Sequence, residues 1–431
     1  MPQMLPARFT ELGLPFQRLL WSDALMLLAL MVGQVAVPWW IAQAGGAADL
    51  AVYGVVLSAV SFITMPLLSP LGDRYPKRWL IAGALAAYAL AACGTAALAS
   101  WGHYALAALI ALQSVPMLAM AVLSPAAASM VAELVPAQQL TRAIGVQQSA
   151  QSMGRLIGPA IGGAVLAAAG TAAALWLNGG LLIAAALLAT RLPSQAIHAP
   201  ASCRWWADLR AGLKANWAIP LERGWITVNF LSWIFLYPAL AMLVPLKVQS
   251  LGLSAAWLGA CEAALSLGML VGSLGASEWW IRRQGRYATR IGSAVIQGLA
   301  LAVAGWTTWP WLLVPAFAVA GLTNSAATLV GLTHRMLARP LAFRARMSAG
   351  SMMTSQVAGT LGPALAGVAL AHWPVSTVYG VFALLGGFGA LGLALIPGFR
   401  AFMALDNDAV NGWYQRAHPE AFVETPPRRS A

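Results

Sequence analysis

The stretch Leu71-Gly72-Asp73-Arg74-Tyr75-Pro76-Lys77-Arg78 is a short, charge-dense break between two long apolar segments. The apolar segments run over about 51–71 and 79–99, and a membrane-spanning helix needs about 20 predominantly apolar residues. Each segment is therefore long enough to cross a bilayer. Because the break is short and rich in Lys and Arg, we expect it to be a cytoplasmic loop between the second and third membrane helices.

The composition of the whole chain agrees with a membrane protein. The 431 residues are 60% hydrophobic and 9% charged, whereas soluble domains carry about 25% charged residues. The first apolar run is longer than a signal-peptide core and is expected to stay as an anchor. The apolar runs predict twelve spans, at about 19–43, 51–71, 79–99, 104–124, 143–168, 171–190, 225–246, 255–277, 290–309, 311–334, 347–371 and 375–396.

The basic residues predict the orientation of the spans. With twelve spans and a cytoplasmic N-terminus, 23 of the 25 Lys and Arg residues fall in inner segments, among them Arg290, Arg335 and Arg339. This bias is the positive-inside pattern. We therefore expect the chain to lie in the inner membrane of the cell, with both termini in the cytoplasm. The formal charge of +12 then reports topology, and a nucleic-acid partner is not expected.

The sequence contains an internal repeat. The stretch 158–167 (GPAIGGAVLA) and the stretch 362–371 (GPALAGVALA) share six of ten positions at an offset of 204. The same offset superposes Arg142 on Arg346 and the first predicted span on the seventh. Parallel six-helix repeats are a known transporter architecture. We therefore predict an all-α membrane protein of two pseudo-symmetric six-helix bundles.

A linker joins the two predicted bundles, and a tail follows the second. Residues 1–190 form the first bundle and residues 225–396 the second. The segment 191–224 between them is either a linker with a short amphipathic helix on the inner leaflet, around 205–210, or a solvated linker. The cytoplasmic tail 397–431 is polar and contains proline, and we expect it to be poorly ordered.

Two motifs in these elements resemble those of the major facilitator superfamily. In the loop, Leu71, Asp73, Arg74, Lys77 and Arg78 fit the signature pattern of that family, whereas Ser69 and Pro76 stand where the pattern has glycines. The resemblance covers about residues 15–396. It implies a transporter, with the loop acting as a latch on the inner side. The alternative is a solubilising loop that only fixes topology.

The second motif lies on the fifth predicted helix and is similar to the glycine–proline motif of the family's exporters. It contains Gly158, Pro159, Gly162 and Gly163, and Arg155 precedes it. Small residues four apart let helix backbones approach closely in lipid, and the proline favours a kink. Together with Arg155 and Asn178, this motif most resembles the branch of the enterobactin exporter and macrolide-efflux (drug:H⁺ antiporter-3) proteins. A hinge between the bundles or simple packing would both use it.

Three ionisable residues fall inside predicted spans, namely Asp23, Arg155 and Glu262. Such residues are costly in a bilayer and are functional candidates by default. With a rise of 1.5 Å per residue, Arg155 and Glu262 reach similar depths on the fifth and eighth helices. We hypothesise that they pair, either as a static ion pair or in gating. Alternatively, Arg155 binds an anionic substrate alone. Asp23 is a proton site or an interfacial acid.

Uncharged polar residues inside the spans are the candidates for a substrate cavity that should lie between the two halves, near the midplane. Each is either a ligand contact or an interhelical hydrogen bond. The candidates are Gln34, Gln113, Gln151, Asn229, Tyr237 and Asn324. No histidine is predicted mid-membrane and no nucleotide-binding loop occurs, so neither a metal nor a cofactor is expected.

These features predict a secondary active transporter and no enzyme. The preferred interpretation is a monomeric, proton-coupled exporter (an antiporter) of a small amphipathic or anionic molecule, siderophore-like or drug-like, which works by alternating access in contact with membrane lipids. Siderophore export and drug resistance are its expected physiological settings. The alternatives are a lysophospholipid or lipid transporter, an importer of small metabolites with the same fold and, more remotely, a membrane-embedded enzyme.

Overall fold

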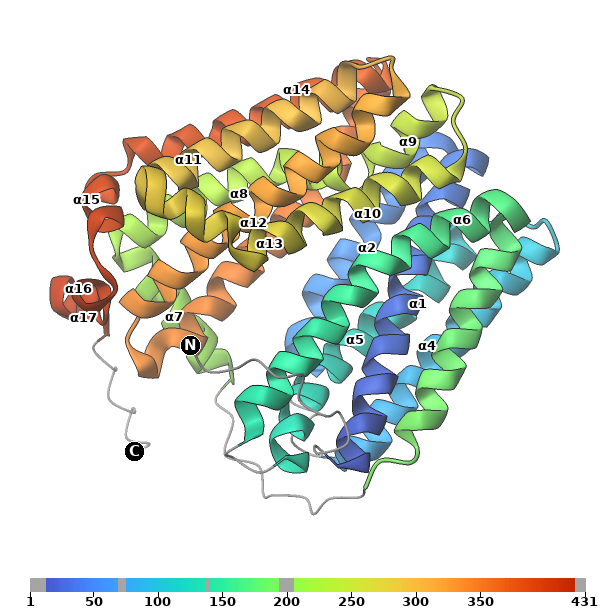
Figure 1. Cartoon of the computed structure of the whole chain (residues 1–431), viewed down its shortest axis with the longest axis horizontal. Coiled ribbons are helices and arrows are strands. Elements are labelled where there is room, and N and C mark those ends of the chain that lie inside the picture. The colour runs from blue at the N-terminus through green and yellow to red at the C-terminus, as the bar shows by residue number, and fades with distance from the viewer. Residues whose placement is uncertain (1–12, 69–74, 136–138, 194–204, 423–431) are drawn as a thin grey trace, which may run out of the picture. The chain divides into compact units, whose positions relative to one another are not determined.

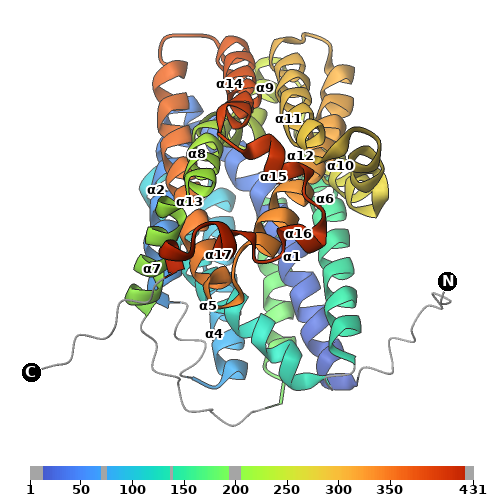
Figure 2. The ribbon, with the colours of Figure 1, turned by 90° about the vertical axis from the view of Figure 1, so that its left-hand side faces the viewer.

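The computed structural model describes residues 13–68, 75–135, 139–193 and 205–422 (Figures 1 and 2). Within these ranges the chain forms helices and turns, and no strand. A helix satisfies its backbone hydrogen bonds internally, which is the requirement for crossing the apolar part of a bilayer. The prediction of an all-α membrane protein is therefore confirmed.

The described residues of the N-terminal part of the chain form five helices. They are α1 (Leu14–Ala44), α2 (Gly46–Leu68), α4 (Lys77–Ser100), α5 (Leu106–Leu134) and α6 (Leu140–Ala189). The last helix turns at Gly170, where φ is 81° and ψ is 177°. This positive φ is accessible to glycine at little cost. The turn divides α6 into two segments that correspond to the predicted spans 143–168 and 171–190.

The remainder of the chain begins with the connecting helix α7 (Trp205–Ala218) and ends with a series of short helices. Between them lie α8 (Pro220–Leu240), α9 (Leu243–Ser250), α10 (Ala255–Val271), η3 (Gly272–Ala276), α11 (Ser277–Trp306), η4 (Pro310–Leu312), α12 (Leu313–Ala338), α13 (Leu341–Leu370), α14 (Val375–Gly389) and η5 (Ala390–Leu395). The short helices are α15 (Phe399–Ala404), α16 (Asn407–Val410), α17 (Trp413–Ala417) and η6 (Pro419–Phe422).

The described helices agree with the predicted spans. Nine stretches of the described residues are long and apolar enough to cross a membrane. Two of them, Met153–Ala189 and Ala255–Trp306, contain turns at glycine and each matches two predicted spans. The predicted span 347–371 lies within α13, which is more polar because it begins with several arginines. The described helices are therefore consistent with twelve spans.

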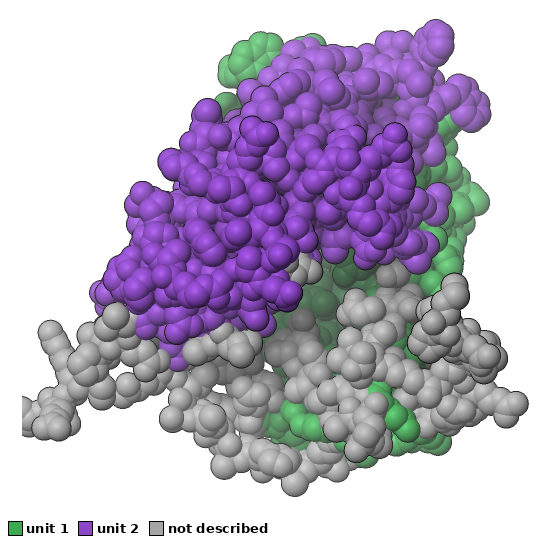
Figure 3. All heavy atoms as spheres, turned by 60° about the vertical axis from the view of Figure 1, so that its left-hand side comes forward, with its two compact units in different colours: residues 1–203, 241–266, 363–375 green, residues 204–240, 267–362, 376–431 purple. Residues whose placement is uncertain are grey.

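The chain forms two compact units, coloured separately in Figure 3. The first unit contains residues 1–203, 241–266 and 363–375, and the second contains residues 204–240, 267–362 and 376–431. These units do not follow the predicted bundle boundaries, since α9, most of α10 and the end of α13 group with the first unit. The division into bundles at 190 and 225 stays a prediction.

The core of the first unit lies among α1, α4, α5 and α6. Fully buried side chains from all four helices meet there, including Leu19, Ile81, Met130 and Leu182. The helix α6 packs against both α1 and α4. Close packing of this kind, rather than the hydrophobic effect, holds helices together in lipid. These contacts give the first unit a largely apolar interior.

The core of the second unit includes the C-terminal segment, and this corrects our expectation of a poorly ordered tail. Phe399, Phe402 and Tyr414 are buried together with Trp225 of α8. The ring centroids of Trp225 and Phe399 lie 5.1 Å apart. Buried aromatic side chains contribute much of a core's stability. For residues 399–422 the prediction was wrong, because the apolar side chains spread among their polar residues are sufficient to anchor the segment in the core; residues 423–431 lie outside the described residues.

Backbone contacts also tie the tail to neighbouring helices. The Gly412 amide donates to the Leu337 carbonyl over 2.9 Å, and Arg286 donates to the Leu405 carbonyl over 3.0 Å. Asp406 caps α16 by accepting from the Ala409 amide at 2.7 Å, the usual role of aspartate at a helix start. The segment Phe399–Phe422 therefore belongs to the folded second unit.

Candidate functional site

A cavity with a volume of about 260 Å³ lies within the second unit. Its walls come from α8, α11, α12, α13, α14 and η5. The apolar walls include Trp225, Trp233, Leu236, Met336 and Met352. The polar walls include Asn229, Ser232, Gln297, Asn324, Thr328, Ser348 and Ser351, and the charged ones are Arg290, Arg335 and Arg339. A largely apolar pocket with a few converging polar groups is the usual form of a small-molecule site.

Helical periodicity brings these residues to one place. On α11, the cavity residues Arg290, Ala294 and Gln297 follow the spacing of i, i+4 and i+7. On α12, Asn324, Thr328 and neighbouring residues continue at similar spacing to Arg335 and Arg339. Residues three or four apart lie on one face of a helix. Each helix therefore presents a polar stripe to the cavity.

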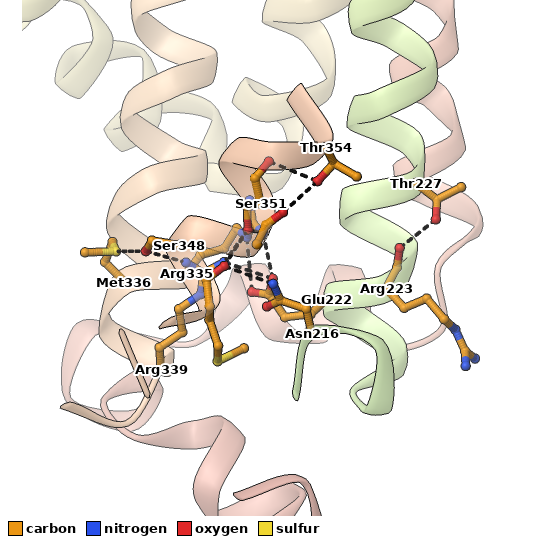
Figure 4. A network of polar contacts seen from close by, with 12 residues as sticks. Asn216, Glu222, Arg223, Thr227, Arg335, Met336, Arg339, Ser348, Ser351 and Thr354 are labelled. Atoms are coloured by element: carbon orange, nitrogen blue, oxygen red, sulfur yellow. Dashed lines mark hydrogen bonds and ion pairs between the residues drawn. The ribbon is translucent and has the colours of Figure 1, made fainter. Parts of the chain in front are cut away.

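A buried carboxylate, Glu222, organises the arginines at one end of the cavity (Figure 4). It lies in the first turn of α8 and is 0% exposed. It accepts from Arg335 Nε at 3.1 Å and Arg335 Nη2 at 2.6 Å, and from Arg339 Nη2 at 3.1 Å. A bidentate arginine–carboxylate contact is among the strong hydrogen bonds of proteins. The position of Glu222 near a helix N-terminus is also favourable for a negative charge.

Two serines of α13 complete this network. Ser348 Oγ accepts from Arg339 Nη1 at 2.9 Å, and Ser351 Oγ accepts from Arg339 Nη2 at 3.1 Å and from Arg335 Nη2 at 3.3 Å. The network therefore joins α8, α12 and α13. Figure 4 shows the side chains of all three helices converging on Glu222. Asn216 of α7 donates to the Met347 carbonyl over 2.9 Å, so the connecting helix packs against α13 beside the network.

The folded tail reaches the same network. Tyr414 is fully buried, and burial together with the nearby Glu222 carboxylate raises the pKa of its phenol well above the usual value. Tyr414 also stacks on Phe402, with centroids 5.7 Å apart. A buried carboxylate is stable only with its partners in place. The tail therefore helps to shield the ion network from water.

Arg290 is a third cavity arginine with different surroundings. It is 8% exposed, and its Nη2 donates to Asn229 Oδ1 over 2.8 Å. Its guanidinium lies over the Trp225 ring, 6.0 Å from the centroid. Its Nε has no hydrogen-bond partner among the described residues, and none of their acids forms an ion pair with it. The cavity wall therefore carries a cation that no carboxylate compensates.

The predicted cavity candidates separate into two groups. Asn229 and Asn324 line this cavity, which lies within the second unit, whereas the sequence placed them at a cavity between the two halves. The others are not part of the cavity in the second unit: Gln113 donates to Thr95 Oγ1 over 3.1 Å between α4 and α5, Gln34 is exposed, and Gln151 is half-buried on α6. Tyr237 is 38% exposed near the end of α8. For Gln113 the structure places the side chain in an interhelical hydrogen bond.

The structure does not bring Arg155 and Glu262 together as an ion pair. Arg155 is exposed on α6, Glu262 is half-buried on α10, and no ion pair joins them among the described residues. The two helices do meet, because Gly163 packs against Gly259. Depth along each helix was estimated from the sequence, but contact also depends on the direction around the helix axis, which depth does not determine.

Asp23 lies in the interior of the first unit. It is buried, with 7% exposure, and its Oδ2 accepts from Gln147 Nε2 at 2.5 Å. The contact joins α1 to α6. Burial of an acid requires hydrogen-bond partners, and Gln147 supplies one. Asp23 is therefore an interior residue of the first unit.

The glycine motif of α6 packs against two helices. A Cβ added to Gly158 would lie 2.5 Å from Met31 Cβ on α1, and a Cβ added to Gly163 would lie 2.7 Å from Gly259 Cα on α10. Both separations are too short for a side chain. Glycine is therefore required at these positions for the close approach of the backbones. In this structure the motif serves helix packing on both sides.

The signature loop is described only in part. Asp73 and Arg74 lie outside the described residues. Lys77 forms an ion pair with Glu133 at the end of α5. The Arg78 guanidinium lies over the ring of its neighbour Trp79, 4.9 Å from the centroid. The basic residues of the motif are therefore held close to the ends of α4 and α5.

The chain belongs to the Major Facilitator Superfamily, whose profile matches residues 19–333. Solved structures agree on the fold. A bacterial homologue of the iron transporter ferroportin, in its inward-facing state, has a TM-score of 0.70 at 13% identity, covering 93% of this chain and 100% of its own. The nucleoside transporter NupG has a TM-score of 0.68 at 16% identity, with 91% and 100% covered.

A bacterial homologue of the human lysosomal transporter Spinster is also similar, with a TM-score of 0.65 at 14% identity, covering 97% of this chain and 100% of its own. The comparison with curated proteins gives no significant match. Identities this low establish the shared fold alone. Family and fold together identify a multi-pass membrane transporter and not an enzyme.

Proposed function

We propose that the chain is a proton-coupled exporter of a small, amphipathic and anionic molecule, and that it works by alternating access. The cavity of the second unit carries this proposal. Its apolar walls, with Trp225 and Trp233, suit the apolar body of such a molecule. Arg335 and Arg339 share the single carboxylate of Glu222, and Arg290 pairs with no described acid, so the site has a surplus of positive charge. A positive, partly apolar site favours an amphipathic anion over a cation.

Proton coupling requires an acid inside the membrane that can change its protonation. Asp23 and Glu262 both lie within helices that can span a membrane. Acids at such positions often serve proton relays in transporters. We propose that one or both carry the coupled proton and that Arg155 takes part in gating or coupling. The latch role of Asp73, Arg74, Lys77 and Arg78 and the hinge role of the α6 glycine motif belong to the same proposal.

The export direction rests on the resemblance to the enterobactin and macrolide exporters. The residues that support it are Arg155, Gly158, Pro159 and Asn178. Siderophores and many drugs combine an apolar body with polar or anionic groups, and the cavity described above suits the compact members of these classes or a compact part of a larger one. We propose a location in the inner membrane with both termini in the cytoplasm, because basic residues accumulate in the segments predicted to face inwards.

The proposal is tested by retention of labelled compounds in cells with and without the protein. The panel contains anionic siderophores, anionic and cationic drugs, and lysophospholipids. We expect lower retention of anionic amphipaths in cells with the protein, and loss of this difference when a protonophore is added. Unchanged retention across the panel would contradict export. Higher accumulation would indicate an importer, and selective loss of lysophospholipids would indicate a lipid transporter.

A further inference from the structure

The three arginines of the cavity differ in how many hydrogen bonds and ion pairs they already form with other residues of the protein. Arg335 and Arg339 share the Glu222 carboxylate and both donate to Ser351. Arg339 also donates to Ser348. These two guanidinium groups are therefore held in a fixed network that joins three helices. Arg339 Nε has no partner among the described residues, but the Glu222 carboxylate already compensates the charge of this arginine.

Arg290 has donors to spare. Its described side-chain hydrogen bond goes to the neutral oxygen of Asn229, and its buried Nε has no partner among the described residues. Burying a guanidinium that no carboxylate neutralises is costly. An anion bound in the cavity would offset this cost, because arginine can form two parallel hydrogen bonds to a carboxylate, sulfonate or phosphate.

The surroundings of Arg290 describe the rest of such a ligand. Trp225 and Trp233 line the same cavity. So do Gln297, which lies two turns further along the same face of α11, and Asn324 on α12. The aromatic rings can contact an apolar or aromatic body, and the two amides can hydrogen-bond to it. With a volume of about 260 Å³, the cavity holds a compact body of one or two rings.

We propose that Arg290 is the anion-recognition residue of this cavity, and that its ligands are compact aromatic or apolar molecules with one carboxylate, sulfonate or phosphate group. The inference rests on the proposed function, because it identifies the substrate class of the same cavity. It goes further by assigning charge selection to Arg290. Arg335 and Arg339 then serve to join α8, α12 and α13, and Glu222 compensates the charge of these two arginines.

Binding to the purified protein in a neutral detergent tests this assignment by isothermal titration calorimetry. The probes are 2-naphthoate, 2-naphthalenesulfonate and 2-naphthyl phosphate, with 2-naphthylmethylammonium as a cation of similar shape. We expect the wild-type protein to bind at least one of the anions about 10- to 100-fold more tightly than the cation, the range that a charge-assisted hydrogen bond provides. Absence of binding by all three anions would overturn the proposal.

Variants then locate the selectivity. Arg290→Met removes the cation at similar volume, and we expect its preference for the anion over the cation to fall to about one. Arg283→Met is the matched control, because Arg283 is an exposed residue of the same helix outside the cavity. Equal loss of selectivity in both variants, or its retention in Arg290→Met, would overturn the assignment.

A second variant keeps the proposal testable if Arg290→Met fails to fold. Asn229→Asp places a carboxylate beside Arg290 Nη2, where the amide oxygen now lies at 2.8 Å. The new acid would neutralise the arginine without removing it, and we expect the same loss of anion preference. Unchanged preference in Asn229→Asp would contradict the proposal.

The inference and the proposed function can fail separately. Anion binding that depends on Arg290, without any efflux in cells, supports the site and contradicts the exporter. Proton-dependent efflux of anions that survives Arg290→Met supports the exporter and overturns the assignment of Arg290.

Discussion

The buried acids of the two units have different hydrogen-bond partners. In the first unit, the hydrogen-bond donor to Asp23 among the described residues is the neutral side chain of Gln147. In the second, Glu222 accepts three hydrogen bonds from two arginines, and two serines hold those arginines in turn. A sequence repeat relates parts of the two halves, yet their buried charges have no such relation. The repeat therefore accounts for the arrangement of the helices, whereas the buried charged residues are particular to each unit.

The largest effect in this comparison is expected from Glu222→Gln. This change leaves Arg335 and Arg339 buried without their carboxylate, and breaking a buried ion pair costs about 3–5 kcal/mol. Unfolding of the purified protein, followed by thermal or denaturant titration in detergent, measures the loss. The double variant Glu222→Gln, Arg335→Met is expected to recover part of it. A loss below about 1 kcal/mol would show that the network contributes little.

Phe402→Ala is expected to have the next largest effect. Phe402 is 1% exposed and packs on Tyr414 and Trp413, and truncating a buried phenylalanine costs about 3 kcal/mol or more. The same unfolding measurement applies. Arg400→Ala, at an exposed position of the same short helix, is the control and should change stability little. Equal stabilities of the two variants would contradict a packed C-terminal segment.

Gly163→Val tests the packing of the first unit. The Cβ would meet Gly259 of α10 at 2.7 Å, and overpacking of this kind costs about 1–3 kcal/mol. Gly180→Val, on the same helix α6, is the control because a Cβ there meets nothing within 4 Å. We expect the first variant alone to lower the unfolding temperature. If both variants lower it equally, helix propensity rather than packing explains the effect.

Asp23→Asn is expected to have the smallest effect on stability. The substitution keeps a hydrogen-bonding group opposite Gln147 and removes a buried charge, so the change should stay within about 1 kcal/mol. This result, set beside that of Glu222→Gln, would sharpen the contrast between the units. A loss as large as that of Glu222→Gln would mean that Asp23 also stabilises its unit through its charge.

Much of the fold could be predicted from the sequence, because hydropathy and the repeat at an offset of 204 both report long-range organisation. Asn229 and Asn324 were predicted as cavity residues because uncharged polar side chains in apolar runs are easy to recognise. Glu222, Arg290, Arg335 and Arg339 were missed as site residues. The three arginines lie at or near the ends of apolar runs, where counting basic residues assigns them to cytoplasmic segments, and Glu222 lies in the predicted linker 191–224.

A helical signal for some of these residues was present. Arg290, Ala294 and Gln297 share one face of α11, and Asn324, Thr328 and Arg335 share one face of α12. The first stripe already lies within the predicted span 290–309, and extending the span 311–334 by one turn includes Arg335. The ion pairs themselves could not be predicted, because Glu222 and Arg335 are 113 residues apart and meet only through the packing of α8 against α12. The same limit applies to the pairing proposed for Arg155 and Glu262.

The central claim is that charge selection resides in the cavity of the second unit and not at the arginine of the first. Uptake of labelled 2-naphthoate and 2-naphthylmethylammonium into inside-out vesicles, driven by a pH gradient, compares Arg290→Met with Arg155→Met directly. We predict that the ratio of anion to cation uptake falls to about one in Arg290→Met and keeps its wild-type value in Arg155→Met, whatever the change in rate. A ratio that falls in Arg155→Met and persists in Arg290→Met would contradict the account.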